Sequence, residues 1–357
     1  MEIVYLYYVA FLLGGIFISY ASNILLLRFS QSLGIRNKNN VLIRWSDESK
    51  PSLGGISLFA GFLFTTIMSL ILLPEINLFG DLRYLGLFIS ASLAFTMGLA
   101  DDAYDTKPYF KLIIQIWCGI VLVITGTTID LFHIYSIDAL LTIIWVIALM
   151  NSLNMLDNMD GITATTVLFA LLSCLASCYV IGIISEPYWL YCLVGVLGAL
   201  LGFLYFNINP SKLFMGDAGS QFIGLFVAFF SIKYLWNLGS TTLNHSWVSV
   251  IITLTALTPA AIDSLTVTIN RLKQGKSPMQ GGKDHTTHHL VYAGFTDKQV
   301  WYLFLLLGFL SFVCSLSILY LTVNNYIYET LFFLVFFIVC FVLLYRVTLK
   351  YKPKKNN

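Results

Sequence analysis

The stretch YWLYCLVGVLGALLGFLYF, residues 188–206, carries no charged side chain from end to end. A helix of about 20 residues, rising about 1.5 Å per residue, crosses the roughly 30 Å hydrocarbon core of a bilayer. Similar apolar runs recur along the chain, at about 3–27, 55–73, 83–100, 110–127, 139–153, 162–184, 188–206, 218–235, 247–269, 300–322 and 326–346. The sequence therefore predicts an all-α polytopic integral membrane protein with about eleven transmembrane helices, the fifth of them short.

The composition agrees with a protein that is surrounded by lipid. Of the 357 residues, 58% are hydrophobic and 11% are charged, and the mean hydropathy is +0.82. All six cysteines lie in apolar runs, which favours simple packing over a disulfide framework. We predict one transmembrane domain over residues 1–349, a basic cytoplasmic tail over 350–357, and no nucleic-acid partner.

The basic residues are distributed unevenly between the two sides of these runs. When the N-terminus is placed outside, only Arg83 and Lys233 of the 20 Lys and Arg fall in outside segments. Cytoplasmic loops carry the excess of basic residues, so the chain is predicted to be N-out and C-in. That orientation needs an odd number of crossings, as eleven provides. The first run lacks a basic start and a cleavage site, and we expect it to be retained as a helix.

Aspartates gather at the ends of the apolar runs. A carboxylate at the centre of a membrane helix costs about 2.5–3.5 kcal/mol, so such a set needs a purpose. The residues are Asp101, Asp102, Asp105, Asp157, Asp160, Asp217, Asp263 and Asp284. In the N-out arrangement all of them lie on or near the cytoplasmic side. We infer a site on that face for a metal, a polyphosphate or both.

The first of four polar clusters places Asp101, Asp102 and Asp105 on one helical turn, followed by Lys107 and Lys111. Carboxylates so close together do not all stay ionised without a cation. Mg²⁺ prefers carboxylate and phosphate oxygens, which suits this arrangement. Lys111 is a candidate contact for a phosphate.

The second cluster repeats a polar side chain every third residue, with Leu and Met between. Its members are Asn151, Asn154, Asp157 and Asp160, and Gly161 follows. Carboxamides and carboxylates on one face of a helix are suited to bind a nucleoside, a sugar or metal-bound water.

The third cluster covers residues 206–220, where Pro210 and two glycines form a tight loop before the next apolar run. Asp217 lies just before that helix, whose free N–H groups suit an anion. Gly216 and Gly219 are expected to let a phosphate approach the backbone.

The fourth cluster lies in a polar loop over 270–299 and contains Arg271. His285, His288 and His289 fall at i, i+3 and i+4, on one face of a helical turn. A zinc site would lack a fourth ligand of usual spacing, so we favour contacts with a substrate phosphate or base.

The four clusters, in this order and on one membrane face, resemble the polyprenyl-phosphate N-acetylhexosamine-1-phosphate transferases. The resemblance covers roughly residues 45–290 and includes Pro51–Gly55 and the segment from Pro259 through Asp263 to Arg271. The family contains the phospho-MurNAc-pentapeptide translocase and the UDP-GlcNAc:undecaprenyl-phosphate GlcNAc-1-phosphate transferases.

The resemblance implies transfer of an N-acetylhexosamine-1-phosphate, GlcNAc-1-phosphate first, from a UDP-sugar to undecaprenyl phosphate, with release of UMP. It implies Mg²⁺ as cofactor, with Mn²⁺ as the alternative. The setting would be the cytoplasmic face of the bacterial inner membrane, at the first membrane step of cell-envelope polysaccharide synthesis. A homodimer is compatible with this interpretation.

The resemblance also implies roles for individual residues. Asp101, Asp102 and Lys111 would be catalytic, and Asp217 would hold the metal with Asp102. The implied substrate contacts are Asn154, Asp157 and Asp160 along the nucleotide-sugar cleft, Asn207 and Phe214 at the uracil, and Arg271, His285, His288 and His289 in the last cytoplasmic loop.

The chain departs from both branches of the family. Asp47 or Glu48 falls where the pentapeptide translocase has a Lys, and three consecutive His are absent. Against the His-x-His-His-Arg of the GlcNAc branch, Thr287 and His289 replace a His and an Arg, and Asn158 replaces a frequent Gly. These departures argue against the pentapeptide translocase and leave the exact sugar open.

Three alternatives remain open at this point. One is the phospho-MurNAc-pentapeptide transferase itself. Another is an intramembrane prenyltransferase, because its Asp-rich pyrophosphate motifs resemble the first two clusters. The third is a cation-coupled transporter, although transporters usually have repeated halves and carboxylates at the midplane.

Overall fold

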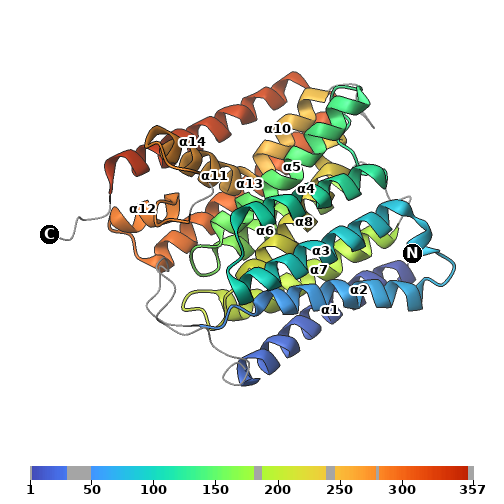
Figure 1. Ribbon diagram of the computed structural model, residues 1–357. Helices are drawn as coiled ribbons and strands as arrows, with labels where there is room; N and C mark the ends of the chain where they lie inside the picture. The colour runs from blue at the N-terminus through green and yellow to red at the C-terminus, as the bar shows by residue number, and fades with distance from the viewer. Residues whose placement is uncertain (1, 30–49, 181–186, 239–245, 279–280, 353–357) are drawn as a thin grey trace.

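The computed structural model describes residues 2–29, 50–180, 187–238, 246–278 and 281–352 (Figure 1). Within these ranges the chain is helical and contains no β-strand, as predicted. The α-helices are α1 (Glu2–Phe29), α2 (Gly54–Leu72), α3 (Leu82–Tyr104), α4 (Pro108–Ile124), α5 (Tyr135–Leu156), α6 (Ile162–Val180), α7 (Pro187–Asn207), α8 (Gly216–Ser231), α10 (Ser246–Ala256), α11 (Thr258–Lys273), α12 (Thr286–Tyr292), α13 (Asp297–Val323) and α14 (Phe332–Lys350). The structure also contains three shorter helical segments: 3₁₀ helices at Leu78–Gly80 and Tyr328–Leu331, and a π-helix at Ile232–Trp236.

The chain is a multi-pass membrane protein. In the described part, 9 helices are long and apolar enough to cross a membrane, and α10 with α11 makes up to 10 if the bent pair is one span. The shorter apolar helix α4 corresponds to the remaining predicted run. Each of the eleven runs thus has a helical counterpart. The number of crossings and the side that each loop faces stay predictions.

Two helices differ from the sequence-based expectation. The run at 247–269 is not one helix, because α10 ends at Ala256 and α11 begins at Thr258 with a bend of 82°. Pro259 in the first turn of α11 has no N–H to continue the helical ladder, which accounts for the break. The fifth run is not short, because α5 has 22 residues and continues through polar Asn151 and Asn154.

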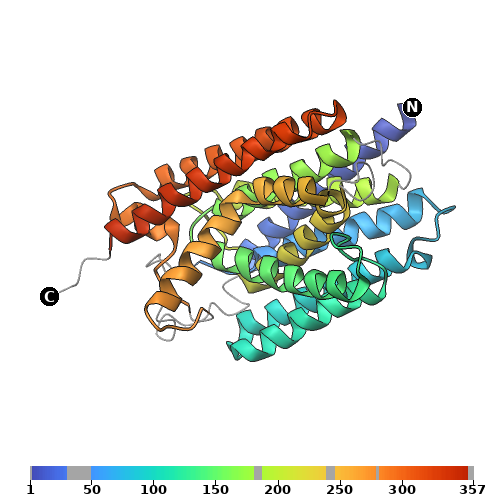
Figure 2. The same cartoon turned by 90° about the horizontal axis from the view of Figure 1, so that it is seen from above.

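The helices lie side by side in a bundle, with α1 and α2 along one edge and α14 along the other (Figure 1). Helices α7 and α8 are buried over most of their length, and α8 contacts α2, α3 and α5. Helix α14 is exposed along nearly its whole apolar length, as expected of a helix that faces lipid. The start of α1 and the end of α14 lie at opposite ends of the bundle in both views (Figure 2).

Glycines bring three helices into backbone contact beside the third cluster. A Cβ added at Gly55 of α2 would lie 2.2 Å from the backbone N of Gly219, and one at Gly98 of α3 would lie 2.3 Å from the carbonyl O of Asp217. Such close crossings are typical of membrane helices with small residues at their interface. The first turn of α8, which carries Asp217, is therefore held between α2 and α3.

This packing corrects the phosphate-approach role predicted for Gly219, because Gly219 faces Gly55 and the space beside it is filled by protein. Gly216 has φ +73° with the carbonyl O of Ser52 and the carboxylate of Asp102 beside it. Gly216 also lines the open pocket described below, so its predicted role stays a prediction. Asp47 and Glu48, most of the first polar loop and the end of the basic tail lie outside the described residues.

Candidate active site

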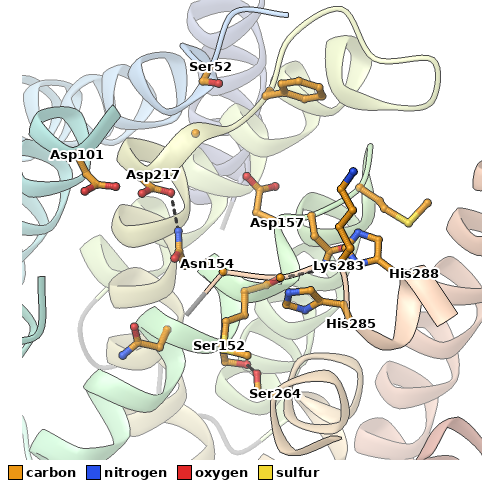
Figure 3. A pocket seen from close by; sticks show the side chains of 18 of the residues that line it. Ser52, Asp101, Ser152, Asn154, Asp157, Asp217, Ser264, Lys283, His285 and His288 are labelled. Carbon is orange, nitrogen blue, oxygen red and sulfur yellow. Dashed lines mark hydrogen bonds between the residues drawn. The ribbon is translucent and has the colours of Figure 1, made fainter. Parts of the chain in front are cut away.

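One open pocket of about 1100 Å³ lies at the end of the bundle that carries α12 (Figure 3). It gathers all the predicted site residues except His289. Those that line it are Asp101, Asp102, Lys111, Asn154, Asp157, Asp160, Asn207, Phe214, Asp217, Arg271, His285 and His288. Residues far apart in the sequence therefore meet at one place.

Lys111 joins two carboxylates from different helices. Its Nζ lies 2.5 Å from Asp101 Oδ2 and 2.7 Å from Asp217 Oδ2. On the other side of Asp217, Asn154 Nδ2 donates to Oδ1 at 2.8 Å and to Ser220 Oγ at 2.9 Å. We name Asp101, Asp102, Lys111, Asn154 and Asp217 the carboxylate cluster. Side chains from α3, α4, α5 and α8 converge in it.

Asp102 caps the start of α8 from a neighbouring helix. Its Oδ1 accepts from the Asp217 N–H at 3.0 Å and its Oδ2 from the Ala218 N–H at 2.9 Å. A helix start leaves its first N–H groups unpaired, and a carboxylate there also meets the positive end of the helix dipole. The anion predicted for this helix end is thus, in this structure, the side chain of Asp102.

A layer of amides lies one helical turn deeper than the carboxylate cluster. Gln115 Nε2 donates to Asn151 Oδ1 and to Gln221 Oε1, both at 3.1 Å, and Asn151 Nδ2 donates back to Gln115 Oε1 at 2.8 Å. Gln115 and Gln221 are buried. The three residues lie on the same helices as Lys111, Asn154 and Asp217, so the layer fixes the register of α4, α5 and α8. This layer was not predicted, although a Gln inside an apolar run is a signal for it.

Two predicted substrate contacts connect loops to one another. Asp160 accepts from the backbone N–H of Ser211 at 2.9 Å and from its Oγ at 2.8 Å. Asn207 donates from Nδ2 to the carbonyl O of Leu213 at 2.9 Å, and its Oδ1 accepts from the Gly161 N–H at 3.1 Å. Both side chains therefore hold the segment after α5 against the loop before α8.

Asp157 differs from Asp160 in its surroundings. It ends α5, and its carboxylate lies in the pocket on the side of Asp217 (Figure 3). Burial and then the negative charge of Asp217 raise the pKa of Asp157 to about 8. The pocket thus holds more acidic groups than its own cations neutralise.

Phe214 forms another part of the pocket wall. The backbone holds it in place, because its N–H donates to the carbonyl O of Pro51 at 3.0 Å and its carbonyl O accepts from Gly54 N–H at 2.9 Å. Lys50 Nζ lies 5.7 Å from the centre of the ring. An aromatic ring beside a cation suits the flat base of a nucleotide and its phosphates.

Arg271 holds the loop that precedes α12. Its guanidinium donates to both carboxylate oxygens of Asp284, at 2.8 and 2.7 Å, and to the carbonyl O of Pro278 at 2.8 Å. Arg271 is only 4% exposed. Burial alone would raise the pKa of Asp284, but the bonds with Arg271 lower it below its ordinary value.

Asp263, to which sequence analysis gave no role of its own, anchors His285. Asp263 is completely buried, and its Oδ2 lies 2.9 Å from His285 Nδ1. Its Oδ1 accepts from the N–H of Thr286 at 2.8 Å and from the hydroxyl at 2.6 Å. With Nδ1 donating to a carboxylate, the other ring nitrogen of His285 is the one available to the pocket. The sequence signals for Asp263 were its place among the aspartates at the ends of apolar runs and its position in the segment from Pro259 to Arg271.

The other two histidines have different surroundings. The predicted helical turn is present as α12, with His285 at its N-cap. The rings of His285 and His288 lie 5.3 Å apart at the pocket, whereas His289 Nδ1 donates to the carbonyl O of Tyr351, away from the pocket lining. Burial and then repulsion by His285 lower the pKa of His288 to about 3. The turn therefore presents two rings to the pocket, not three.

The donor set bears on the predicted metal. Among the described residues, no group of three or more His, Cys, Asp or Glu is arranged to hold an ion. Mg²⁺ commonly takes one or two carboxylates and completes its shell with water and substrate phosphates. The oxygen donors around Asp217 fit that mode of binding, while Asp102 has both oxygens engaged with α8.

Comparisons with known proteins identify relatives of this chain. Residues 84–235 match the model of glycosyl transferase family 4. An undecaprenyl-phosphate alpha-N-acetylglucosaminyl 1-phosphate transferase of Haemophilus influenzae is 32% identical over 320 residues, which cover 84% of this chain and 82% of that protein. The protein of the same name in Pasteurella multocida is 31% identical over 338 residues, covering 89% and 87%. That of Escherichia coli K12 is 26% identical over 270 residues, covering 71% and 68%.

Proposed function

This chain belongs to the polyprenyl-phosphate N-acetylhexosamine-1-phosphate transferases of glycosyl transferase family 4, and from that membership we propose its reaction. It transfers GlcNAc-1-phosphate from UDP-GlcNAc to undecaprenyl phosphate and releases UMP. The observation that carries the proposal is the meeting of Asp101, Lys111, Asn154 and Asp217 in one open pocket. The family membership argues against the prenyltransferase and transporter interpretations.

In the proposed step an oxygen of the lipid phosphate attacks the β-phosphorus of the UDP-sugar. A P–O bond forms there, the bond from the β-phosphorus to the oxygen bridging to the α-phosphorus breaks, and that oxygen leaves with UMP. Phosphoryl transfer depends mainly on positioning and on stabilising negative charge. Lys111 supplies a fixed positive charge, and Asn154 holds Asp217 in orientation.

Asp101 would orient the lipid phosphate at the mouth of the cluster. Its Oδ1 accepts from Thr106, both from the backbone N–H at 2.9 Å and from the hydroxyl at 2.5 Å. The carboxylate is thereby fixed at the end of α3, beside Lys111. Because a phosphate monoester is already largely ionised near neutral pH, we assign Asp101 to orientation and not to proton removal.

The proposed cofactor is Mg²⁺, with Mn²⁺ as a substitute. Bound at Asp217 with the pyrophosphate, it would add positive charge where the reaction needs it. Asp102 would contribute mainly by fixing the backbone under Asp217, because its oxygens already accept two N–H groups.

The nucleoside is proposed to lie against Phe214, near the loop that Asn207 holds. The hexosamine is proposed to face the wall formed by α12 and the end of α5, which the same pocket includes. A bulky peptide on the donor is not expected.

A donor panel tests the proposal. Purified protein, undecaprenyl phosphate and Mg²⁺ are incubated with UDP-GlcNAc, UDP-GalNAc or UDP-MurNAc-pentapeptide, and UMP and the lipid product are measured by mass. We expect UMP and undecaprenyl diphosphate GlcNAc. Transfer of phospho-MurNAc-pentapeptide with none of phospho-GlcNAc would make the substrate wrong while keeping the reaction class.

The pocket is proposed to open to the cytoplasm of a bacterial inner membrane, where nucleotide sugars are made. Reporter fusions at residues 130 and 324 should then report the outside, and a fusion at residue 350 the inside. If the fusion at residue 350 were found outside, the pocket would not open to the cytoplasm.

A further inference from the structure

Asn158 and Thr287 form a hydrogen bond behind the pocket wall. Thr287 Oγ1 lies 2.6 Å from Asn158 Oδ1, across 129 residues of sequence. Thr287 is completely buried in the first turn of α12, whereas Asn158 is partly exposed and lines the pocket. The bond therefore fixes a carboxamide that faces the pocket from its buried side.

The two residues are also two of the positions at which this chain departs from the pattern of the family that it resembles. Asn158 stands where a Gly is frequent, and Thr287 stands where the GlcNAc branch has a His. Their direct contact places both departures at one point of the pocket wall. A large imidazole at position 287 and a side chain at position 158 would compete for the same space, so a residue with a side chain at 158 needs a small partner at 287.

Asn158 retains hydrogen-bonding capacity toward the pocket. Its Nδ2 donates to the carbonyl O of Met155 at 2.9 Å, and its Oδ1 accepts from Thr287. A carboxamide has two N–H hydrogens and two lone pairs, so one hydrogen and one lone pair are left over. Both are held in fixed directions, and neither changes with pH.

The wall around Asn158 is the part of the pocket left for the sugar. The Lys111–Asp217 side carries the charges that suit phosphates, and Phe214 lies on the wall that suits a base. What remains between the end of α5 and α12 includes the uncharged carboxamide of Asn158 and the ring of His288, along with Lys283. Neutral donors and acceptors such as this carboxamide suit hydroxyl and acetamido groups.

We propose that Asn158, fixed by Thr287, is a specificity-determining residue that contacts the hexosamine of the UDP-sugar donor. The proposal rests on the proposed function and adds a residue, Asn158, that determines which donor sugar the enzyme accepts. A site built to bond a particular hydroxyl leaves its own polar groups unpaired when an epimer binds, and this asymmetry gives discrimination.

The test compares turnover of UDP-GlcNAc and of its C4 epimer UDP-GalNAc, as the ratio of kcat/KM values. Thr287→Val removes the hydroxyl at nearly constant volume, and Asn158→Gly removes the carboxamide. Loss of one bond of about average strength predicts a change of about fivefold or more in the ratio. Thr287→Ser keeps the hydroxyl and should keep the ratio. Thr287→His should lose activity, and adding Asn158→Gly should restore it.

A second buried Asn–Thr pair gives a matched control. Asn270 Nδ2 donates to Thr348 Oγ1 at 2.9 Å, joining α11 to α14 outside the pocket lining. Thr348→Val should leave the donor ratio unchanged within about twofold, because this bond does not face the donor. An unchanged ratio in both Asn158→Gly and Thr287→Val, with normal protein levels, would overturn the proposal. Absence of UMP release from wild type with every donor would instead overturn the proposed function and the proposal with it.

Discussion

The carboxylate cluster and the histidine turn (His285–His289 with its partners Asp263, Arg271 and Asp284) face the same pocket but treat charge in opposite ways. In the turn, each buried charge has a dedicated partner: Arg271 with Asp284, and Asp263 with His285. In the cluster, one lysine serves two carboxylates, and further acids lie nearby. One region pairs its buried acids one to one, and the other has more acidic groups than cations to neutralise them.

From this difference we infer which residues hold the pocket in shape and which are available to bind a ligand. A closed set of ion pairs gains nothing from a ligand ion, so it serves to hold a loop in one geometry. An excess of carboxylates costs stability unless a cation arrives, and such a cost is typical of functional sites. We therefore expect substitutions in the cluster to affect the reaction and substitutions in the turn to affect first the fold of the loop.

The largest effect is expected at Asp217. Asp217→Ala or removal of divalent cations with EDTA should lower turnover at least about 10³-fold, because a lost metal ligand forfeits several kcal/mol of transition-state stabilisation. UMP release by protein that retains its thermal midpoint is the measurement. Glu75→Gln, an exposed carboxylate away from the pocket, is the control. Full turnover in excess EDTA would contradict the proposed metal requirement. It would also contradict the expectation that the carboxylate cluster, and not the histidine turn, serves the reaction.

Lys111 comes next. Lys111→Met leaves Asp101 and Asp217 facing each other without their shared cation, and we expect turnover to fall about 10²-fold, the usual scale for removing one charged stabiliser. Lys111→Arg keeps the charge and should retain more activity than Lys111→Met. Equal activities of the two variants would show that the positive charge is not what matters.

Substitution of Arg271, in the histidine turn, should affect first the stability of the fold. Breaking a buried ion pair costs about 3–5 kcal/mol, and because the side chain of Asp284 is 34% exposed we expect about 3 kcal/mol or less for Arg271→Ala. The matched control is Arg83→Ala, whose more exposed pair with Asp81 should contribute about 1 kcal/mol or less. Thermal unfolding in detergent measures both. A larger loss of thermal stability for Arg83→Ala than for Arg271→Ala would contradict the expectation that the more buried ion pair contributes more.

The smallest effect concerns pH and His288. Its folded pKa of about 3 lies below the ordinary 6.5, so between these values the unfolded chain binds more protons. Acid therefore destabilises the fold as pH falls below about 6.5, by up to about 2 kcal/mol at pH 5, and the stability is fully present above that range. His288→Gln should lose less thermal stability than wild type between pH 7.5 and pH 5. An identical loss in both proteins would show that another group titrates.

Much of this fold follows from local sequence. Each apolar run is helical, and the bend that divides the run at 247–269 into α10 and α11 has a local signal in Pro259. The three-residue repeat of Asn151, Asn154 and Asp157 also placed a polar face at the end of α5. These features depend on neighbours within a turn or two, which is where side-chain pattern is informative.

Roles that depend on distant partners were not predictable in the same way. Asp102 acts on amides 115 and 116 residues away, and Thr287 bonds a residue 129 positions before it. Gly219 suggested a phosphate loop until α2 was seen to occupy its open side. The residue types were correctly singled out, but only tertiary packing decides whether such a residue serves a ligand or another helix.

The cap that Asp102 provides also has a consequence for biogenesis. The ribosome delivers α3 well before α8, so the acceptor is already in the membrane when the start of α8 arrives. Until the two meet, the first amides of α8 have no acceptor in their own helix. The start of α8 therefore gains its cap only when α3 and α8 pack together. One carboxylate thus links the order in which the two helices are made to the assembly of the pocket.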